Sequence, residues 1–106
     1  MKKNIQELST GRKVEIREMS IDEIDECNDV AYIITQGEEN IVRNLSKART
    51  SWIRYGLGGG DFKNFKLNDN KQVSDSVVRQ LSEVEKSELA VVIQGTQYVG
   101  EEKPSH

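Results

Sequence analysis

Few side chains of this chain have the types and spacing that chemistry requires. The only histidine, His106, is the last residue, and the only cysteine, Cys27, lies among carboxylates that disfavour a thiolate. The carboxylates of residues 22–29 do not have the spacing of a calcium loop, so they predict a solvated helix face. We therefore expect an inert core thiol at Cys27, no catalytic residue, no metal and no cofactor.

A glycine cluster at residues 56–60 is the most unusual feature of the chain. It does not match a phosphate-binding loop, because Asp61 and Phe62 follow it where such a loop has Lys and Ser or Thr. Glycine reaches positive φ at no steric cost, so the cluster predicts a flexible loop that adapts to a partner. The residues expected to bind that partner are Arg49, Trp52, Arg54, Tyr55, Leu57, Gly58, Gly59 and Phe62.

Length and composition predict one small domain, since the chain has 106 residues and a net charge of −3. A single cysteine cannot form an internal disulfide, which indicates a reducing compartment. Polar residues follow Met1-Lys2-Lys3, so no signal peptide is expected. Every apolar run is far shorter than the roughly 20 residues of a membrane span. We therefore expect a cytosolic protein with no membrane contact.

The charges are segregated along the chain, with a basic stretch at residues 41–79 between acidic flanks. Such a stretch can be compensated within the fold or can face an acidic partner. Because Trp52 and Tyr55 lie among its cations, a small nucleic-acid-binding or regulatory protein is an alternative. Trp52, however, shares an apolar helical row with Ile41 and Leu45, and the whole chain is acidic. Nucleic acid is therefore not the expected partner.

The first part of the chain predicts a β-hairpin followed by a helix. Apolar and polar residues alternate on both sides of a turn at residues 9–12, which predicts a hairpin over residues 4–17. Ser20 and Glu23 have the spacing of a capping box, and Gly37 is a natural end for the helix that they begin.

The remainder predicts further helices. A second helix is expected from about Glu38 to Tyr55, then a long connection over residues 56–72, a short helix after Ser74, and a last helix that Ser82 and Glu85 cap. The predicted fold class is mainly α: a small helical domain of three to four helices at residues 1–100, with a short N-terminal β-hairpin. A mobile polar tail is expected at residues 101–106.

Two segments carry a family resemblance. Residues 8–20, Leu-Ser-Thr-Gly-Arg-Lys-Val-Glu-Ile-Arg-Glu-Met-Ser, lead into an acidic helix. Near the end, a Ser-Glu-Val-Glu-Lys helix at residues 82–86 precedes a polar tail. Together these features resemble the small tail assembly chaperones of long-tailed, siphovirus-like bacteriophages, in the short form that some members extend by a ribosomal frameshift. The resemblance extends loosely over most of the chain but assigns no role to residues 52–65.

The resemblance implies a non-enzymatic, self-associating protein of the host cytoplasm that is absent from the finished virion. Its partners would be the tape measure protein, whose helices it keeps soluble, and the tail tube protein, whose assembly it promotes. A minor structural component of the head–tail connector is a further alternative, which differs in remaining with the particle.

Overall fold

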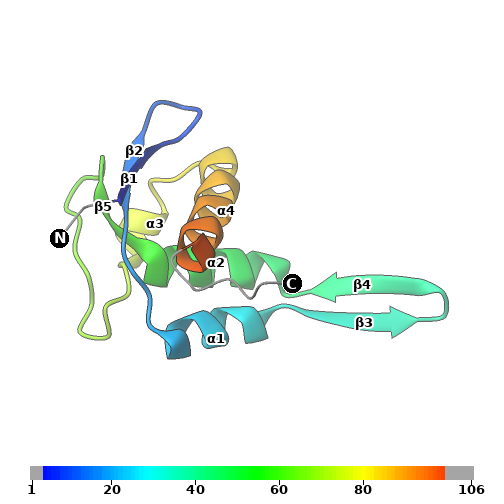
Figure 1. Ribbon diagram of the computed structural model, residues 1–106. Coiled ribbons are helices and arrows are strands. Elements are labelled where there is room, and N and C mark those ends of the chain that lie inside the picture. Colours follow the sequence, from blue (N-terminus) through cyan, green and yellow to red (C-terminus); the bar gives the residue numbers. More distant parts are fainter. Residues whose placement is uncertain (1–3, 100–106) are drawn as a thin grey trace.

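The structure is a computed structural model that describes residues 4–99. Its elements follow the order β1 (Asn4–Glu7), β2 (Lys13–Ile16), α1 (Ile21–Val30), β3 (Tyr32–Gln36), β4 (Glu39–Arg43), α2 (Leu45–Gly56), β5 (Leu57–Gly60), α3 (Asp75–Val78) and α4 (Glu83–Val99). Figure 1 shows a body of helices and a small sheet, from which β3 and β4 project. We call this projection, residues 32–43, the arm. The predicted tail at residues 101–106 lies outside the described residues.

The domain is mixed α/β and not mainly α. Residues 4–99 form four helices, a three-stranded antiparallel sheet of order β1-β2-β5, and the two-stranded arm. The predicted N-terminal hairpin is confirmed, because β1 and β2 pair from Asn4↔Ile16 to Glu7↔Lys13. The predicted fold class was wrong in omitting the third strand and the arm. No helix of the described part of the chain is both long and apolar enough to cross a membrane.

Helix α1 begins as predicted but ends early. The backbone N–H of Ser20 donates to the Glu23 carboxylate at 2.9 Å, and the Glu23 N–H donates to the Ser20 hydroxyl at 3.2 Å, which confirms the capping box. The helix ends at Val30, not at Gly37. The next residues, Tyr-Ile-Ile-Thr, are aromatic and β-branched, and such side chains favour a strand over a helix.

The arm replaces the first turns of the predicted second helix. Strands β3 and β4 pair from Tyr32↔Arg43 to Gln36↔Glu39, so the turn contains only two residues. Gly37 has φ 60°, which suits the first position of a type II′ turn. Helix α2 therefore begins at Leu45, after Asn44 in the left-handed region at φ 61°. Ile41, which the sequence pattern placed on the helix, belongs to β4.

The glycine cluster ends α2 and forms β5, so the predicted flexible loop was wrong. β5 pairs antiparallel with β2, with Val14 opposite Gly60 and Ile16 opposite Leu57. A Cβ at Gly58 would lie 3.1 Å from the Cβ of Arg17. Gly60 has φ 127°, which side chains rarely adopt, and a Cβ there would clash with the Lys13 carbonyl. The glycines therefore permit close approach of two backbones.

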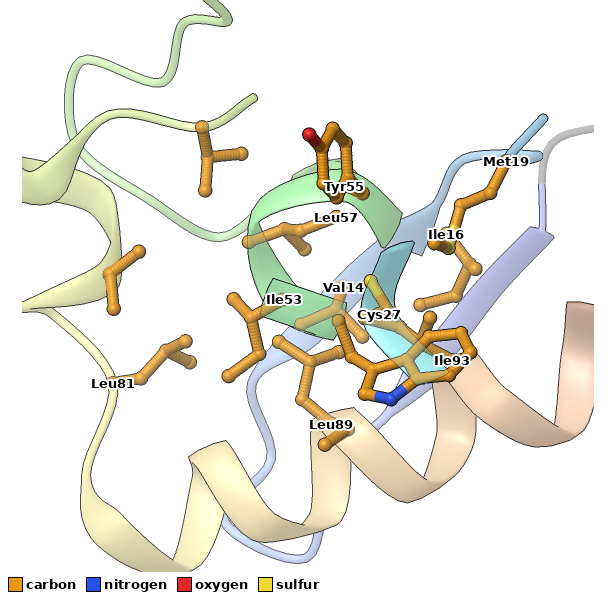
Figure 2. Close-up of a cluster of buried hydrophobic side chains, with 14 of the residues drawn as sticks. Val14, Ile16, Met19, Cys27, Ile53, Tyr55, Leu57, Leu81, Leu89 and Ile93 are labelled. Carbon is orange, nitrogen blue, oxygen red and sulfur yellow. The ribbon is translucent and has the colours of Figure 1, made fainter. Parts of the chain in front are cut away.

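The core lies between the three-stranded sheet, α2 and α4. Figure 2 shows Val14 of β2, Ile53 of α2 and Ile93 of α4 pointing into one cluster, and all three side chains are fully buried. Phe62 and Phe65, in the connection after β5, pack against this cluster with their ring centroids 5.9 Å apart. The predicted cap of the last helix is confirmed, since Ser82 N–H donates to Glu85 at 2.9 Å and Glu85 N–H donates to the Ser82 hydroxyl at 3.1 Å.

Candidate functional site

Three aromatic or apolar residues of the predicted partner site belong to the core. Trp52 is 3% exposed and Leu57 is fully buried. Tyr55 is 9% exposed, and its hydroxyl donates a hydrogen bond of 2.8 Å to the Glu26 carboxylate, which raises the pKa of Tyr55. These side chains hold α2 against the rest of the body, so they offer a partner almost no surface.

The two arginines of the predicted site form ion pairs within the chain. Arg49 Nη2 lies 2.9 Å from Glu83 Oε1, which ties α2 to the start of α4. Arg54 pairs with Asp75 of α3 and also donates to the Val73 carbonyl at 3.0 Å. The hydrogen bonds from these arginines lower the pKa of Asp75 and of Glu83. Both guanidinium groups therefore have internal partners.

The remaining predicted residues lie at the junction of α2 and β5. Gly58 and Gly59 are strand residues packed on Arg17 and Glu15 of the neighbouring chain segment. Phe62 is half-buried beneath the Arg12 guanidinium, whose carbon lies 4.9 Å from the ring centroid. The structure thus gathers the predicted residues around one junction, but mainly through contacts inside the fold. That they bind a partner remains a prediction.

A polar cluster around Glu85 fastens the N-terminal hairpin to α4. Glu85 is 5% exposed, and its Oε2 accepts hydrogen bonds from Thr10 Oγ1 at 2.6 Å and from Arg12 Nε at 3.0 Å. Its Oε1 accepts from the Ser82 N–H. These hydrogen bonds lower the pKa of Glu85 to about 2. The bond from Thr10 makes the largest contribution to this shift, and the bond from Ser82 the next largest.

Arg12 extends this cluster to the connection after β5. Its Nη2 donates to the Gln80 carbonyl at 3.0 Å, and its Nη1 donates to the Asp61 carbonyl. Asp61 in turn accepts from the Lys13 N–H at 2.9 Å. One guanidinium thus joins the hairpin, this connection and the residues before α4. Its importance could not be read from the sequence, because its partners lie 49 to 73 positions away.

The only cysteine has an environment that suppresses its reactivity. Cys27 is 1% exposed, and burial, with a smaller contribution from the Glu26 and Glu23 carboxylates, raises its pKa to about 12. The thiol therefore stays protonated near neutral pH. Across the described residues, no three His, Cys, Asp or Glu side chains are grouped so that they could hold a metal ion.

An open groove lies between the end of β1 and the outer face of α4. It has a volume of about 440 Å³ and is lined by Glu7, Leu8, Ser9, Ser87, Glu88, Val91 and Val92. Val91 is 68% exposed, and Val84, one heptad earlier, is 58% exposed. The exposure of Val84 and Val91 gives α4 an apolar stripe toward solvent.

The arm carries a second group of exposed apolar side chains. Tyr32 is 51% exposed and Val42 is 49% exposed, and Leu45, just beyond the arm, is 65% exposed. Figure 1 shows β3 and β4 extending away from the helices and the three-stranded sheet. Two-stranded hairpins are marginal in water without further packing. The arm therefore has the character of a contact surface.

Basic residues gather in a hollow at the base of the arm. Its volume is about 600 Å³, and it is lined by Val30, Asn44, Ser46, Lys47, Thr50, Ser51 and Arg54. Hydroxyl groups and cations of this kind could meet a phosphate. Arg54, however, is paired with Asp75, and Trp52 and Tyr55 are buried away from solvent. The aromatic stacking that would favour single-stranded nucleic acid is therefore missing from this hollow.

Comparisons with known proteins add no relative. A scan against protein-family models matches none, and searches of the curated proteins and of the solved structures find no match.

Proposed function

We propose that this chain is a non-enzymatic tail assembly chaperone of a long-tailed bacteriophage. It would bind the tape measure protein in the cytoplasm of the host and promote assembly of the tail tube. The family resemblance of residues 8–20 and 82–86 motivates the proposal. The structural observation that best supports it is the open groove along α4, because a chaperone for a long helical protein needs a surface that accepts amphipathic helices.

The outer face of α4 has the spacing that helix docking requires. Val84, Glu88 and Val91 lie four and three residues apart, so they follow one another along one side of the helix. Gly95 continues this row, and a Cβ there would meet nothing within 4 Å, which leaves room for a close backbone approach. The two valines would contact the apolar stripe of a client helix, while Glu88 and Glu7 would meet basic residues at its margin.

A shallow groove with few polar contacts also suits a client made of many different segments. Specific hydrogen bonds would restrict binding to one sequence, whereas apolar contact along a ridge accepts any helix with a suitable stripe. The docking surface that we propose is therefore α4 with the end of β1, and not the α2–β5 junction, whose side chains are largely occupied within the fold.

The experiment is co-expression of the chain with segments of the tape measure protein. Val91→Asp should sharply lower the soluble fraction of the client, because it places a charge in the middle of the apolar stripe. Ile21→Asp is the matched control: Ile21 is also an exposed aliphatic residue on a helix, 74% exposed on α1. Equal loss with both variants, or no loss with Val91→Asp, would contradict the proposed surface.

Two observations test the function apart from the surface. The proposal expects a tail tube gene upstream and a long gene for a helical protein downstream. It also expects mass spectrometry of purified particles to find no copy of this chain. A head–tail connector component would instead be present in the particles.

A further inference from the structure

The free edge of β4 has a charge pattern that is complementary to itself. Glu39, Ile41 and Arg43 occupy alternate positions of the strand, so their side chains share one face of the arm. On that face, Ile41 has the acid Glu39 as its neighbour toward the tip of the arm and the base Arg43 as its neighbour toward the body. We propose that β4 pairs antiparallel with β4 of a second copy of this chain, about a two-fold axis at Ile41.

The backbone of β4 selects the same register. The two-residue turn makes the backbone N–H and C=O groups of Gln36 and Glu39 face each other. In an antiparallel ladder the direction of these groups alternates along the strand, so the backbone groups of Ile41 and Arg43 also point toward β3. The N–H and C=O groups of Asn40 and Val42 therefore point away from β3. With the axis at Ile41, Asn40 lies opposite Val42 of the second copy, so these outward groups meet each other.

The side chains then form symmetric pairs. Glu39 lies opposite the Arg43 of the second copy, and the symmetry repeats this pair on the other side of the axis. Ile41, which is half-buried, lies opposite its own copy at a position without mutual backbone hydrogen bonds, where side chains approach most closely. Shifting one strand by one residue would break the charge pairs and would place the outward-pointing backbone groups of Asn40 and Val42 opposite residues whose groups point toward β3.

The edge of β3 does not offer an equivalent pattern. The charged residues of the arm are Glu38, Glu39 and Arg43, all in the turn or on β4, so two β3 edges would bring no opposite charges together. Pairing through β4 instead gives a sheet of order β3-β4-β4-β3. Two strands alone are marginal in water, and independent stability needs at least three strands with a hydrophobic face, so pairing favours the arm. This inference uses another surface than the α4 groove and does not rest on the proposed function.

Charge reversal tests the register directly. The wild-type chain should show a concentration-dependent dimer in sedimentation equilibrium. Glu39→Arg and Arg43→Glu should each weaken it about tenfold, because each puts like charges opposite each other twice. A mixture of the two variants in equal amounts should restore association. One variant has arginine at positions 39 and 43 and the other has glutamate at both, so each arginine then faces a glutamate of the other variant. Glu39→Arg with Arg43→Glu in one chain should restore it as well.

Amide hydrogen exchange provides a readout that does not depend on a variant. On dimerisation, the amides of Asn40 and Val42 should become protected, while that of Thr35 on the outer edge of β3 should not. A chain that remains monomeric at millimolar concentration overturns the proposal. So does a dimer whose affinity ignores both charge reversals, or one that protects Thr35 and leaves Val42 unprotected.

Discussion

The buried carboxylate of Glu85 should make a measurable, pH-dependent contribution to stability. Its two oxygens accept hydrogen bonds from Thr10, Arg12 and Ser82 at 2.6, 3.0 and 2.9 Å. Glu85→Gln keeps the shape of the side chain but replaces one acceptor oxygen by a donor. Either the cap from Ser82 or the pair from Thr10 and Arg12 must then be lost, because a donor cannot accept their protons.

The pKa of Glu85 gives the magnitude. It falls from 4.5 to about 2 in the folded protein, and a tenfold change in proton affinity corresponds to about 1.4 kcal/mol. Because Arg12 is partly exposed, the stabilisation is smaller than the value obtained by converting the whole pKa shift into free energy. We therefore expect Glu85→Gln to lower the free energy of unfolding by roughly 2–3 kcal/mol at neutral pH. A folded pKa below the unfolded one means that this stabilisation is complete above pH 4.5 and is lost as the pH falls through about 2.

Urea unfolding followed by Trp52 fluorescence measures the effect, since this residue is 3% exposed in the folded chain and is the only tryptophan. The difference between wild type and Glu85→Gln should shrink between pH 4.5 and about 2. Glu83→Gln is the matched control, because Glu83 is also in the first turn of α4 and ion-paired, but its side chain is 74% exposed. The reasoning is refuted if the difference in unfolding free energy between wild type and Glu85→Gln is the same at both ends of this pH range. It is also refuted if Glu83→Gln loses as much stability as Glu85→Gln.

Two further predictions concern how closely single residues are packed. Gly56→Ala should destabilise the chain by about 1–3 kcal/mol, because the new Cβ would lie 2.9 Å from Ile93 Cδ1, whereas Gly95→Ala on exposed α4 surface should stabilise it by about 0.5–1 kcal/mol. Thermal melting of both variants checks the pair, and equal shifts would contradict it. Cys27 should resist alkylation in the folded chain at about pH 8, because it is buried and its pKa is about 12, and it should react freely in urea. Rapid labelling of the folded chain would contradict this prediction and would show that α1 opens.

The parts of the fold that depend on neighbouring residues could be predicted from the sequence. Ser20 with Glu23 and Ser82 with Glu85 form capping boxes that need only three residues of separation, and both exist. The N-terminal hairpin depends on one short turn and on alternation, and it exists too. In these cases the local pattern and the tertiary structure agree, so local rules suffice.

The arm was missed because two local patterns compete in the same residues. Ile41 continues the helical spacing of Leu45, Ala48 and Trp52, which favoured one long helix. The stronger signal was the pair of β-branched and aromatic runs on both sides of Gly37, which is typical of a hairpin with a two-residue turn. Weighing that signal against helical periodicity would have ended α1 at Val30.

The role of the glycine cluster could not be predicted because it depends on distant partners. Gly56 faces Ile93, Gly58 faces Arg17, and Gly60 faces Lys13, and none of these contacts is visible from the local sequence. The sequence suggested that these glycines give a loop conformational freedom. In the structure they instead leave the space in which α4 packs against α2 and β2 packs against β5. The largely buried residues around the cluster are consequently less able to bind a partner than the pattern indicated.

This use of the glycines changes where function is to be sought. Helix α2 passes into β5 without a loop, and the arginines of α2 are paired with Glu83 and Asp75. Apolar residues that the core does not need remain at Val84 and Val91 on α4 and at Tyr32 and Val42 on the arm. Exposure of such side chains on a small domain opposes solubility unless something covers them. A client helix on α4 would cover the first group, and a second copy along β4 would bring its Asn40 beside Val42, both without disturbing the core, while Tyr32 would stay on the outer strand β3.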